Sequence, residues 1–122
     1  MRKAAGLSVL VVFALVALSG LVMAGANNFG MPVYPGASYD EATSKAVKQM
    51  LSTEATCYRT KDSAKKVMEF YKKQPGLQPF IADDKNAMFK KGKIDITVQT
   101  PWMDMKTGKM NNDTLISIVK NQ

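Results

Sequence analysis

The chain has 122 residues, with 17 lysines and arginines against 10 acidic residues and a formal net charge of +7. It contains no histidine and a single cysteine, which excludes Ser-His and Cys-His catalysis, the usual histidine metal centres and an internal disulfide bond. A chain of this length has room for one modest domain with a single hydrophobic core.

The first 26 residues have the order of a secretory signal peptide. Arg2 and Lys3 precede an apolar run that extends to Met23, and the small residues Ala24-Gly25-Ala26 follow it. We predict cleavage after Ala26, because a membrane anchor does not need small residues at its outer edge. An uncleaved anchor is the alternative, since the apolar run is long enough to cross a bilayer. In that case the leader would provide the only membrane contact of the protein.

Residues 27–122 are predicted to form a single α+β domain that is exported to the periplasm or the cell exterior. Removal of Arg2 and Lys3 lowers the formal charge from +7 to +5, and a positive exported protein is drawn to anionic surfaces such as lipid head groups or cell-wall polymers. Arg59 is the only arginine in this part, whereas nucleic-acid recognition usually relies on arginine. We therefore expect an envelope component as partner, with anionic material as one candidate, and no nucleic acid.

The start of the mature chain predicts an irregular arm and then a helix. Pro32 and Pro35 prevent regular ladder pairing, and Pro35-Gly36 suits the centre of a type II turn. Asp40 is a suitable N-cap for a helix that runs to about Leu51. The apolar side of this helix consists of Ala42, Ala46, Val47, Met50 and Leu51.

A strand follows this helix. Alternation from Ala55 to Thr60 predicts a strand with Ala55, Cys57 and Arg59 on one face. The single cysteine is expected to be buried as a small hydrophobic residue, and pairing with another chain is the alternative. Cys57 is a poor candidate nucleophile, because no histidine is present to activate its thiol.

The second predicted helix has the clearest pattern in the chain. Asp62 or Ser63 is its N-cap, and Pro75-Gly76 ends it. Its polar side carries three lysines and a glutamate. This helix is therefore expected to pack its apolar side on the core and to expose its polar side to solvent. The apolar side consists of Ala64, Val67, Met68, Phe70 and Tyr71.

The C-terminal half predicts strands. After a loop through Asp83 and Asp84, residues 86–101 form a predicted hairpin with a tight turn at Lys91-Gly92. A last strand is predicted from Thr114 to Lys120. This order predicts an α+β fold in two layers, with one or two helices on one face of a mostly antiparallel sheet of about four strands.

Three short motifs occur in the first half of the mature chain: VYPGA at 33–37, YRTKDS at 58–63 and VMEFY at 67–71. Together they resemble a group of small exported bacterial proteins of unknown function, in which a Y-P-G-A turn precedes a T-x-D-S helix start and a V-x-x-F-Y helix. The resemblance implies a fold and no catalytic residue, because these motifs describe turns, caps and core positions. The glycine-tryptophan pair that follows the main helix in that group is replaced here by PGLQPF.

Two patterns imitate catalytic motifs. Ser63-x-x-Lys66 and Lys106-Thr107-Gly108 match two of the three signatures of penicillin-binding proteins and serine β-lactamases. The S-D-N signature is missing and the mature chain is too short for that two-part fold. The adjacent acids Asp83 and Asp84 could act as an acid/base pair only if burial separated their pKa values, and we expect them to face water. We therefore predict no catalytic residue, no cofactor and no enzymatic activity.

The segment TPWMDMKTGKM, residues 100–110, places the only tryptophan beside three methionines. Thioether sulfur is a soft ligand, and exported methionine clusters near a tryptophan can hold Cu(I). On a strand, Met103 and Met105 would share a face. The simpler interpretation is adaptable packing at the rim of the sheet, followed by a turn around Gly108. On that interpretation no residue is a metal ligand.

Two functional hypotheses are favoured over a third, a small hydrolase or lysine-based enzyme, which would need Lys, Asp and Tyr side chains gathered in one pocket. The first is an exported, non-enzymatic binding or structural module of the bacterial envelope, whose contact surface is the sheet face or the lysine-rich side of a helix. The second is a periplasmic carrier of copper or silver that uses Met103 and Met105, with Met110 as a further ligand.

Overall fold

The computed structural model describes residues 28–122, so the predicted signal peptide, residues 1–26, lies outside the described residues. The described part contains two helices, α2 (Glu41–Leu51) and α3 (Ala64–Lys72). Neither of them is long and apolar enough to span a membrane. The strands are β1 (Ser38–Tyr39), β2 (Glu54–Thr60), β3 (Gln78–Ala82), β4 (Asn86–Lys91), β5 (Ile94–Gln99), β6 (Trp102–Met103), β7 (Met110–Asn111) and β8 (Thr114–Lys120).

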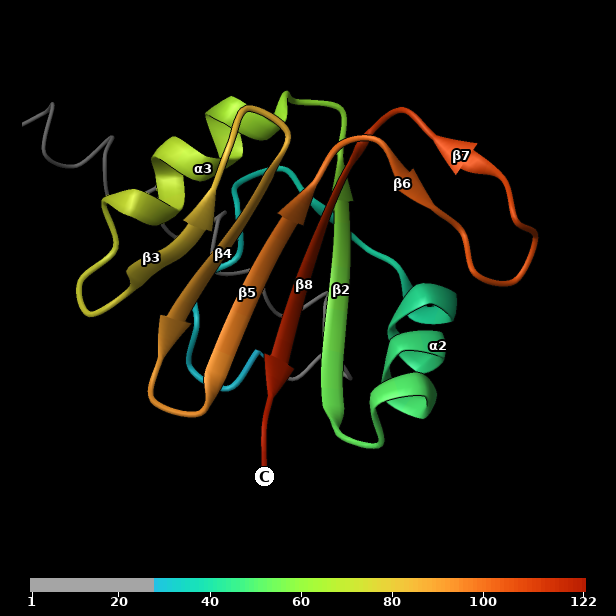
Figure 1. The fold of residues 1–122 in the computed structure, drawn as a ribbon, viewed down its shortest axis with the longest axis horizontal. Coiled ribbons are helices and arrows are strands. Elements are labelled where there is room, and N and C mark those ends of the chain that lie inside the picture. Colours follow the sequence, from blue (N-terminus) through green and yellow to red (C-terminus); the bar gives the residue numbers. More distant parts are fainter. Residues whose placement is uncertain (1–27) are drawn as a thin grey trace, which may run out of the picture.

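Six of the strands form one antiparallel sheet in the order β1-β2-β8-β5-β4-β3 (Figure 1). The C-terminal strand β8 lies inside this sheet between β2 and β5, and β6 pairs with β7 in a separate ladder. The predicted α+β class is confirmed, with two helices packed on an antiparallel sheet. The expected number of about four strands is wrong, because the sheet has six strands and the ladder adds two.

Strand β3 is the main element that the sequence pattern does not reveal. Its residues, QPFIA, do not alternate between apolar and polar types, and Pro79 cannot donate a ladder hydrogen bond. In the structure β3 is an edge strand that pairs with β4, and its register shifts between Pro79 and Ile81. An edge position tolerates a proline because the outer side of the strand has no ladder to complete.

The two helices lie on opposite faces of the sheet, so the expectation that they cover one face is wrong. Side chains alternate along β2, and Tyr58 belongs to the buried cluster under α3 whereas Cys57 belongs to the cluster under α2. Strand β8 is apolar at successive positions, with Ile116 on the α3 face and Leu115 on the α2 face. Both faces of these central strands therefore need a cover.

Both helices begin where the sequence predicts. The Asp40 carboxylate accepts a hydrogen bond from the backbone N–H of Thr43 (2.9 Å). The Ser63 hydroxyl accepts one from the backbone N–H of Lys66 (3.3 Å). The predicted hairpin and the predicted last strand are also confirmed, as β4–β5 and β8. The turn consists of Gly92 and Lys93, one residue later than predicted, because Lys91 still pairs with Ile94.

The N-terminal arm closes the core under α3. Tyr71 is fully buried, and its hydroxyl donates a hydrogen bond to the carbonyl oxygen of Pro32 (3.0 Å). Tyr34 meets Phe70 edge-on, with the ring centroids 5.5 Å apart. An apolar contact and a hydrogen bond therefore hold the arm against this helix, and the α3 face of the sheet is filled.

Candidate functional site

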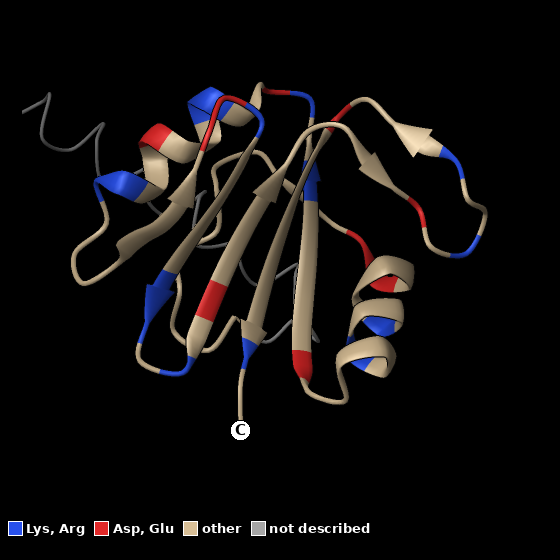
Figure 2. Ribbon diagram, viewed as in Figure 1, with Lys and Arg blue, Asp and Glu red and all other residues tan. Residues whose placement is uncertain are grey.

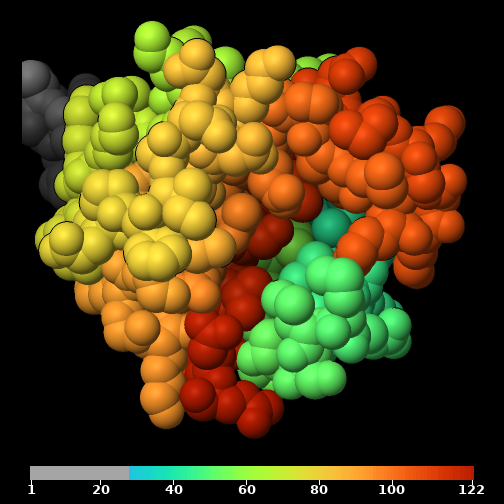
Figure 3. Space-filling view, viewed as in Figure 1, coloured from blue at the N-terminus to red at the C-terminus, as the bar shows by residue number. Residues whose placement is uncertain are grey.

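A groove of about 540 Å³ opens between α2, the β6–β7 hairpin and the sheet face that α2 covers only in part (Figure 3). Strands β5 and β8 provide its floor, α2 forms one wall and the hairpin forms the other. The floor is mostly apolar next to α2, where β8 contributes two apolar residues and one serine, and polar at β5. Its residues are Thr97, Gln99, Leu115, Ser117 and Val119.

Helix α2 leaves part of its apolar side uncovered. Of its predicted apolar side only Val47 is buried, in the same cluster as Ala55 and Cys57, and the other buried residue of this helix is the polar Ser44. Met50 and Leu51, however, are 60% and 49% exposed and line the groove. Helix α2 packs mainly on β2, near the edge of the sheet, so its last turn extends beside the floor without a covering element.

Arg59, Asp40 and Trp102 line the groove and interact with Asp113, and we call these four side chains the Arg59 cluster. The Arg59 Nε donates to Asp113 (2.8 Å) and its Nη1 lies 3.7 Å from Asp40. The indole N–H of Trp102 donates to the second oxygen of Asp113 (2.8 Å). The guanidinium carbon lies 5.0 Å from the centre of the Trp102 ring, a cation–π distance.

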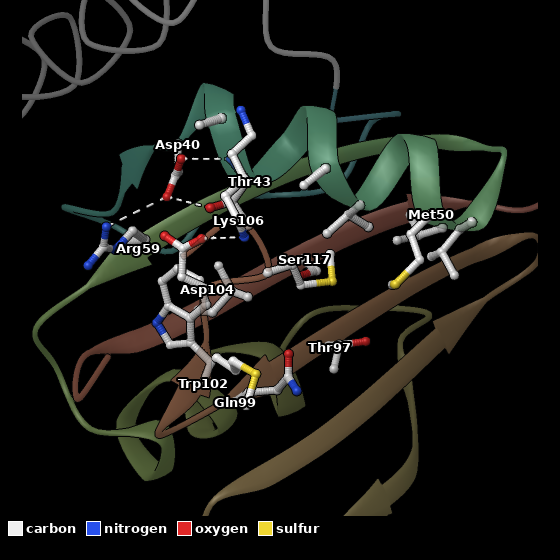
Figure 4. A pocket seen from close by; sticks show the side chains of 18 residues that line it. Asp40, Thr43, Met50, Arg59, Thr97, Gln99, Trp102, Asp104, Lys106 and Ser117 are labelled. Carbon is white, nitrogen blue, oxygen red and sulfur yellow. Dashed lines mark hydrogen bonds and ion pairs between the residues drawn. The ribbon is translucent and has the colours of Figure 1, made fainter. Parts of the chain in front are cut away.

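The Arg59 cluster joins distant parts of the chain. Asp40 is also the N-cap of α2 and lies beside Arg59 of β2 (Figure 4). Through Asp113, the cluster further connects this helix to β6 and to the residue that precedes β8. The hydrogen bond that Arg59 donates to Asp113 raises the pKa of Arg59, and partial burial opposes this effect. The negative charges of Asp40 and Asp113 thus neutralise the positive charge of Arg59. The cluster therefore has mainly a structural role beside the groove.

Sequence reasoning missed this cluster, although one signal was present. Arg59 shares a strand face with Ala55 and Cys57, which are buried. An arginine on an apolar face requires a carboxylate partner, because a partly buried charge without one is costly. The pattern could have predicted a partner of this type, but the identity of Asp113, far along the chain, follows only from the pairing of β2 with β8.

The β6–β7 hairpin separates the tryptophan from the methionines. Trp102 pairs with Asn111 and Met103 pairs with Met110. Because successive side chains of a strand point to opposite sides, Trp102 points inward and is 3% exposed, while Met103 and Met110 are 57% and 54% exposed. Trp102 is thus a core residue of the α2 face.

Met105 does not share a strand face with Met103, because β6 ends at Met103. It lies in the turn, where the Asp104 side chain accepts hydrogen bonds from the backbone of Lys106 (2.8 Å) and Thr107 (3.3 Å). The predicted turn around Gly108 is confirmed. Met103 and Met105 both line the groove, whereas Met110 is not one of its lining residues.

Cys57 is fully buried, as the sequence predicts. Its backbone N–H donates to the Ser44 hydroxyl (2.7 Å), and its thiol lies 3.5 Å from the Ser117 hydroxyl. Burial raises the pKa of the Cys57 thiol, which keeps it protonated and unreactive at neutral pH.

The residues that imitate catalytic motifs have local structural roles. Ser63 is the exposed N-cap of α3, and Lys106-Thr107-Gly108 lies in the hairpin turn. Asp83 is exposed and accepts hydrogen bonds from the backbone N–H groups of Lys85 and Asn86 (both 2.8 Å), which lower its pKa. Among residues 28–122 no group of three or more His, Cys, Asp and Glu side chains is placed to hold a metal ion.

Comparison of the chain with protein-family models, with curated proteins and with solved structures gave no match. The resemblance carried by the VYPGA, YRTKDS and VMEFY motifs therefore stays a prediction. The fold and the site define an α+β protein with a partly apolar groove on one sheet face.

Proposed function

We propose that the mature chain is a non-enzymatic binding module of the bacterial envelope, and that its groove takes up the apolar part of an anionic amphiphile. The observation that carries this proposal is that exposed apolar side chains from two separate elements line one groove. They are Met50 and Leu51 of α2 and Met103 and Met105 of the hairpin.

The groove has the size and lining that an apolar chain requires. Its volume of about 540 Å³ lies within the range of about 300–1,000 Å³ that is typical of small-molecule sites. It extends along α2, whose 11 residues correspond to a length of about 16 Å. Flexible methionine walls adapt to chains of different shape, and each buried methylene group contributes about 0.8 kcal/mol.

The charge of the protein supports an anionic head group. Lys106 lines the groove, and within the described part of the chain no carboxylate forms an ion pair with its ammonium group. Other basic residues lie in the hairpin turn and on α2 (Figure 2), although Lys45 and Lys48 of α2 pair with Glu41 and Glu54. Salt screens such exposed charges, so the head-group part of the affinity is expected to fall with ionic strength while the apolar part persists.

The test is a titration of the chain 27–122 with decanoate, below its micelle concentration, followed by the fluorescence of Trp102. This residue is the only tryptophan and it lines the groove. Replacing Met50→Gln is expected to weaken binding about tenfold, because it removes roughly 1.4 kcal/mol of apolar contact. Met110→Gln is the matched control, since Met110 has nearly the same exposure, 54% against 60%, and lies outside the groove.

Two outcomes would contradict this function. The first is a titration that does not saturate, and the second is an equal loss of affinity in the Met50→Gln and Met110→Gln variants. A parallel titration with decyl maltoside, which has the same chain length but no charge, separates the head-group contribution from the apolar contribution. Added salt is expected to weaken decanoate binding and to leave decyl maltoside binding unchanged.

Export is tested by the intact mass of the chain recovered from the bacterial envelope. We expect a mass that begins at Asn27. Replacing Ala24 and Ala26 with leucine is expected to preserve the leader, because bulky residues are not accepted at the cleavage site. Ala26→Ser, which keeps a small residue, is the control and should still be cleaved. A wild-type chain that begins at Met1 would show that the leader is kept.

A further inference from the structure

The β6–β7 hairpin carries three exposed thioethers, those of Met103, Met105 and Met110. Met103 and Met110 are register partners in the ladder. Their side chains therefore leave the same face of the hairpin, with Cβ atoms about 4.5–5.5 Å apart. Met105 follows in the connecting turn and is 47% exposed.

Core packing does not account for these three methionines. Met68 shows what a packing methionine looks like in this protein, because it is 5% exposed and belongs to the cluster under α3. Trp102 alone anchors the hairpin to the cluster under α2. The face that carries Met103 and Met110 points away from that anchor, so their sulfur atoms are accessible to a ligand.

We propose that Met103 and Met110, together with Met105, bind a soft monovalent metal ion, Cu(I) or Ag(I). Thioether sulfur is a soft ligand that selects such ions over hard cations. This site shares Met103 and Met105 with the groove lining, but the cross-strand partner Met110 lies outside the groove and the site needs no amphiphile, so it does not rest on the proposed groove function.

The hairpin holds the cross-strand pair in place before an ion arrives. The backbone N–H of Asp104 donates to the carbonyl oxygen of Lys109 (2.8 Å), and that of Gly108 donates to the carbonyl oxygen of Asp104 (2.7 Å). These bonds close the turn between the two short strands. Only side-chain rotamers then have to be ordered on binding, which lowers the entropic cost of forming the site.

The experiment is a titration of the chain 27–122 with silver nitrate in chloride-free buffer, followed by NMR of ¹³C-labelled methionine methyl groups. We expect saturation at one ion per chain and shifts at Met103, Met105 and Met110, with Met68 unchanged. The double variant Met103→Leu/Met110→Leu is expected to bind at least about tenfold more weakly. Met50→Leu, at another exposed methionine, and Cys57→Ala, which removes the only thiol, are expected to retain the wild-type affinity.

The pH dependence distinguishes thioethers from other ligands. Thioether sulfur does not titrate, so the affinity is expected to stay constant between about pH 8 and about pH 5, where a thiolate site would weaken through protonation. A steep loss towards low pH, an equal loss in Met50→Leu and in the double variant, or no saturable shift of the methionine methyl groups would overturn the proposal. The decanoate titration is independent of these outcomes, since its test residue is Met50.

Discussion

Replacing Trp102→Ala is expected to lower the free energy of unfolding by about 3–5 kcal/mol, the usual cost of truncating a large buried aromatic residue. Trp102 is 3% exposed and lies in the same buried cluster as Val47 and Leu115. Its loss would leave a cavity under α2 and remove the indole N–H that donates a hydrogen bond to Asp113. Because the hairpin has no other anchor in this cluster, we expect its two short strands to open as well.

The Trp102 prediction is measured by urea unfolding followed by far-ultraviolet circular dichroism. Trp102→Phe is the matched variant, since it keeps an aromatic ring beside Arg59 but removes the N–H that donates to Asp113. Its expected cost is about 1 kcal/mol beyond the change in ring size, which is typical of one hydrogen bond. A loss below about 1 kcal/mol for Trp102→Ala would mean that the indole is not packed as the structure shows.

The second large effect is expected at Tyr71, on the other face of the sheet. Tyr71→Ala should also cost about 3–5 kcal/mol, because the ring is fully buried and lies 4.9 Å from Phe70 and 6.0 Å from Phe89, centre to centre. Burial raises the pKa of Tyr71, so its hydroxyl stays protonated and donates to the Pro32 carbonyl across the ordinary pH range.

Tyr71→Phe separates the hydrogen bond from the packing. It is expected to cost about 1 kcal/mol and to speed amide hydrogen exchange in the N-terminal arm, which loses one of its contacts to α3. Tyr39→Phe is the control, since the Tyr39 ring contacts Tyr58 and no hydrogen bond from its hydroxyl is present in the described part of the chain. Equal effects of the two variants would contradict a specific role of the Pro32 contact.

The two sites also test the arrangement of the helices. Trp102 and Tyr71 belong to separate clusters on opposite faces of the sheet. Changes at sites without shared partners usually add to within about 0.5 kcal/mol. We therefore expect the losses of unfolding free energy in Trp102→Phe and Tyr71→Phe to add in the double variant. If the two residues packed in a single core, the double variant would depart from this sum.

Local chemistry explains the elements that could be predicted from the sequence. The caps Asp40 and Ser63, the tight turn at Gly92 and the period of the apolar residues each act over a few neighbouring positions. Strand β3 cannot be predicted in this way, because it is stabilised by its pairing with β4 despite Pro79. No local sequence pattern indicates that pairing partner.

The candidate site depended more strongly on tertiary structure. Successive apolar residues in β8 indicate a strand buried on both sides, but they do not say which helix covers which face. The groove exists because α2 packs on β2, near the edge of the sheet, and leaves Met50 uncovered. Likewise, sequence spacing favoured Met103 with Met105, while the hairpin register pairs Met103 with Met110.

The sequence by itself determined the absence of histidine chemistry, the local start of each helix and the burial of Cys57, because composition and near-neighbour contacts are enough for these. Only the tertiary structure decided the opposite placement of the helices, the partners of Arg59 and the groove. These features depend on contacts between residues far apart in the chain, and the strand pairing that creates such contacts is a property of the whole sheet.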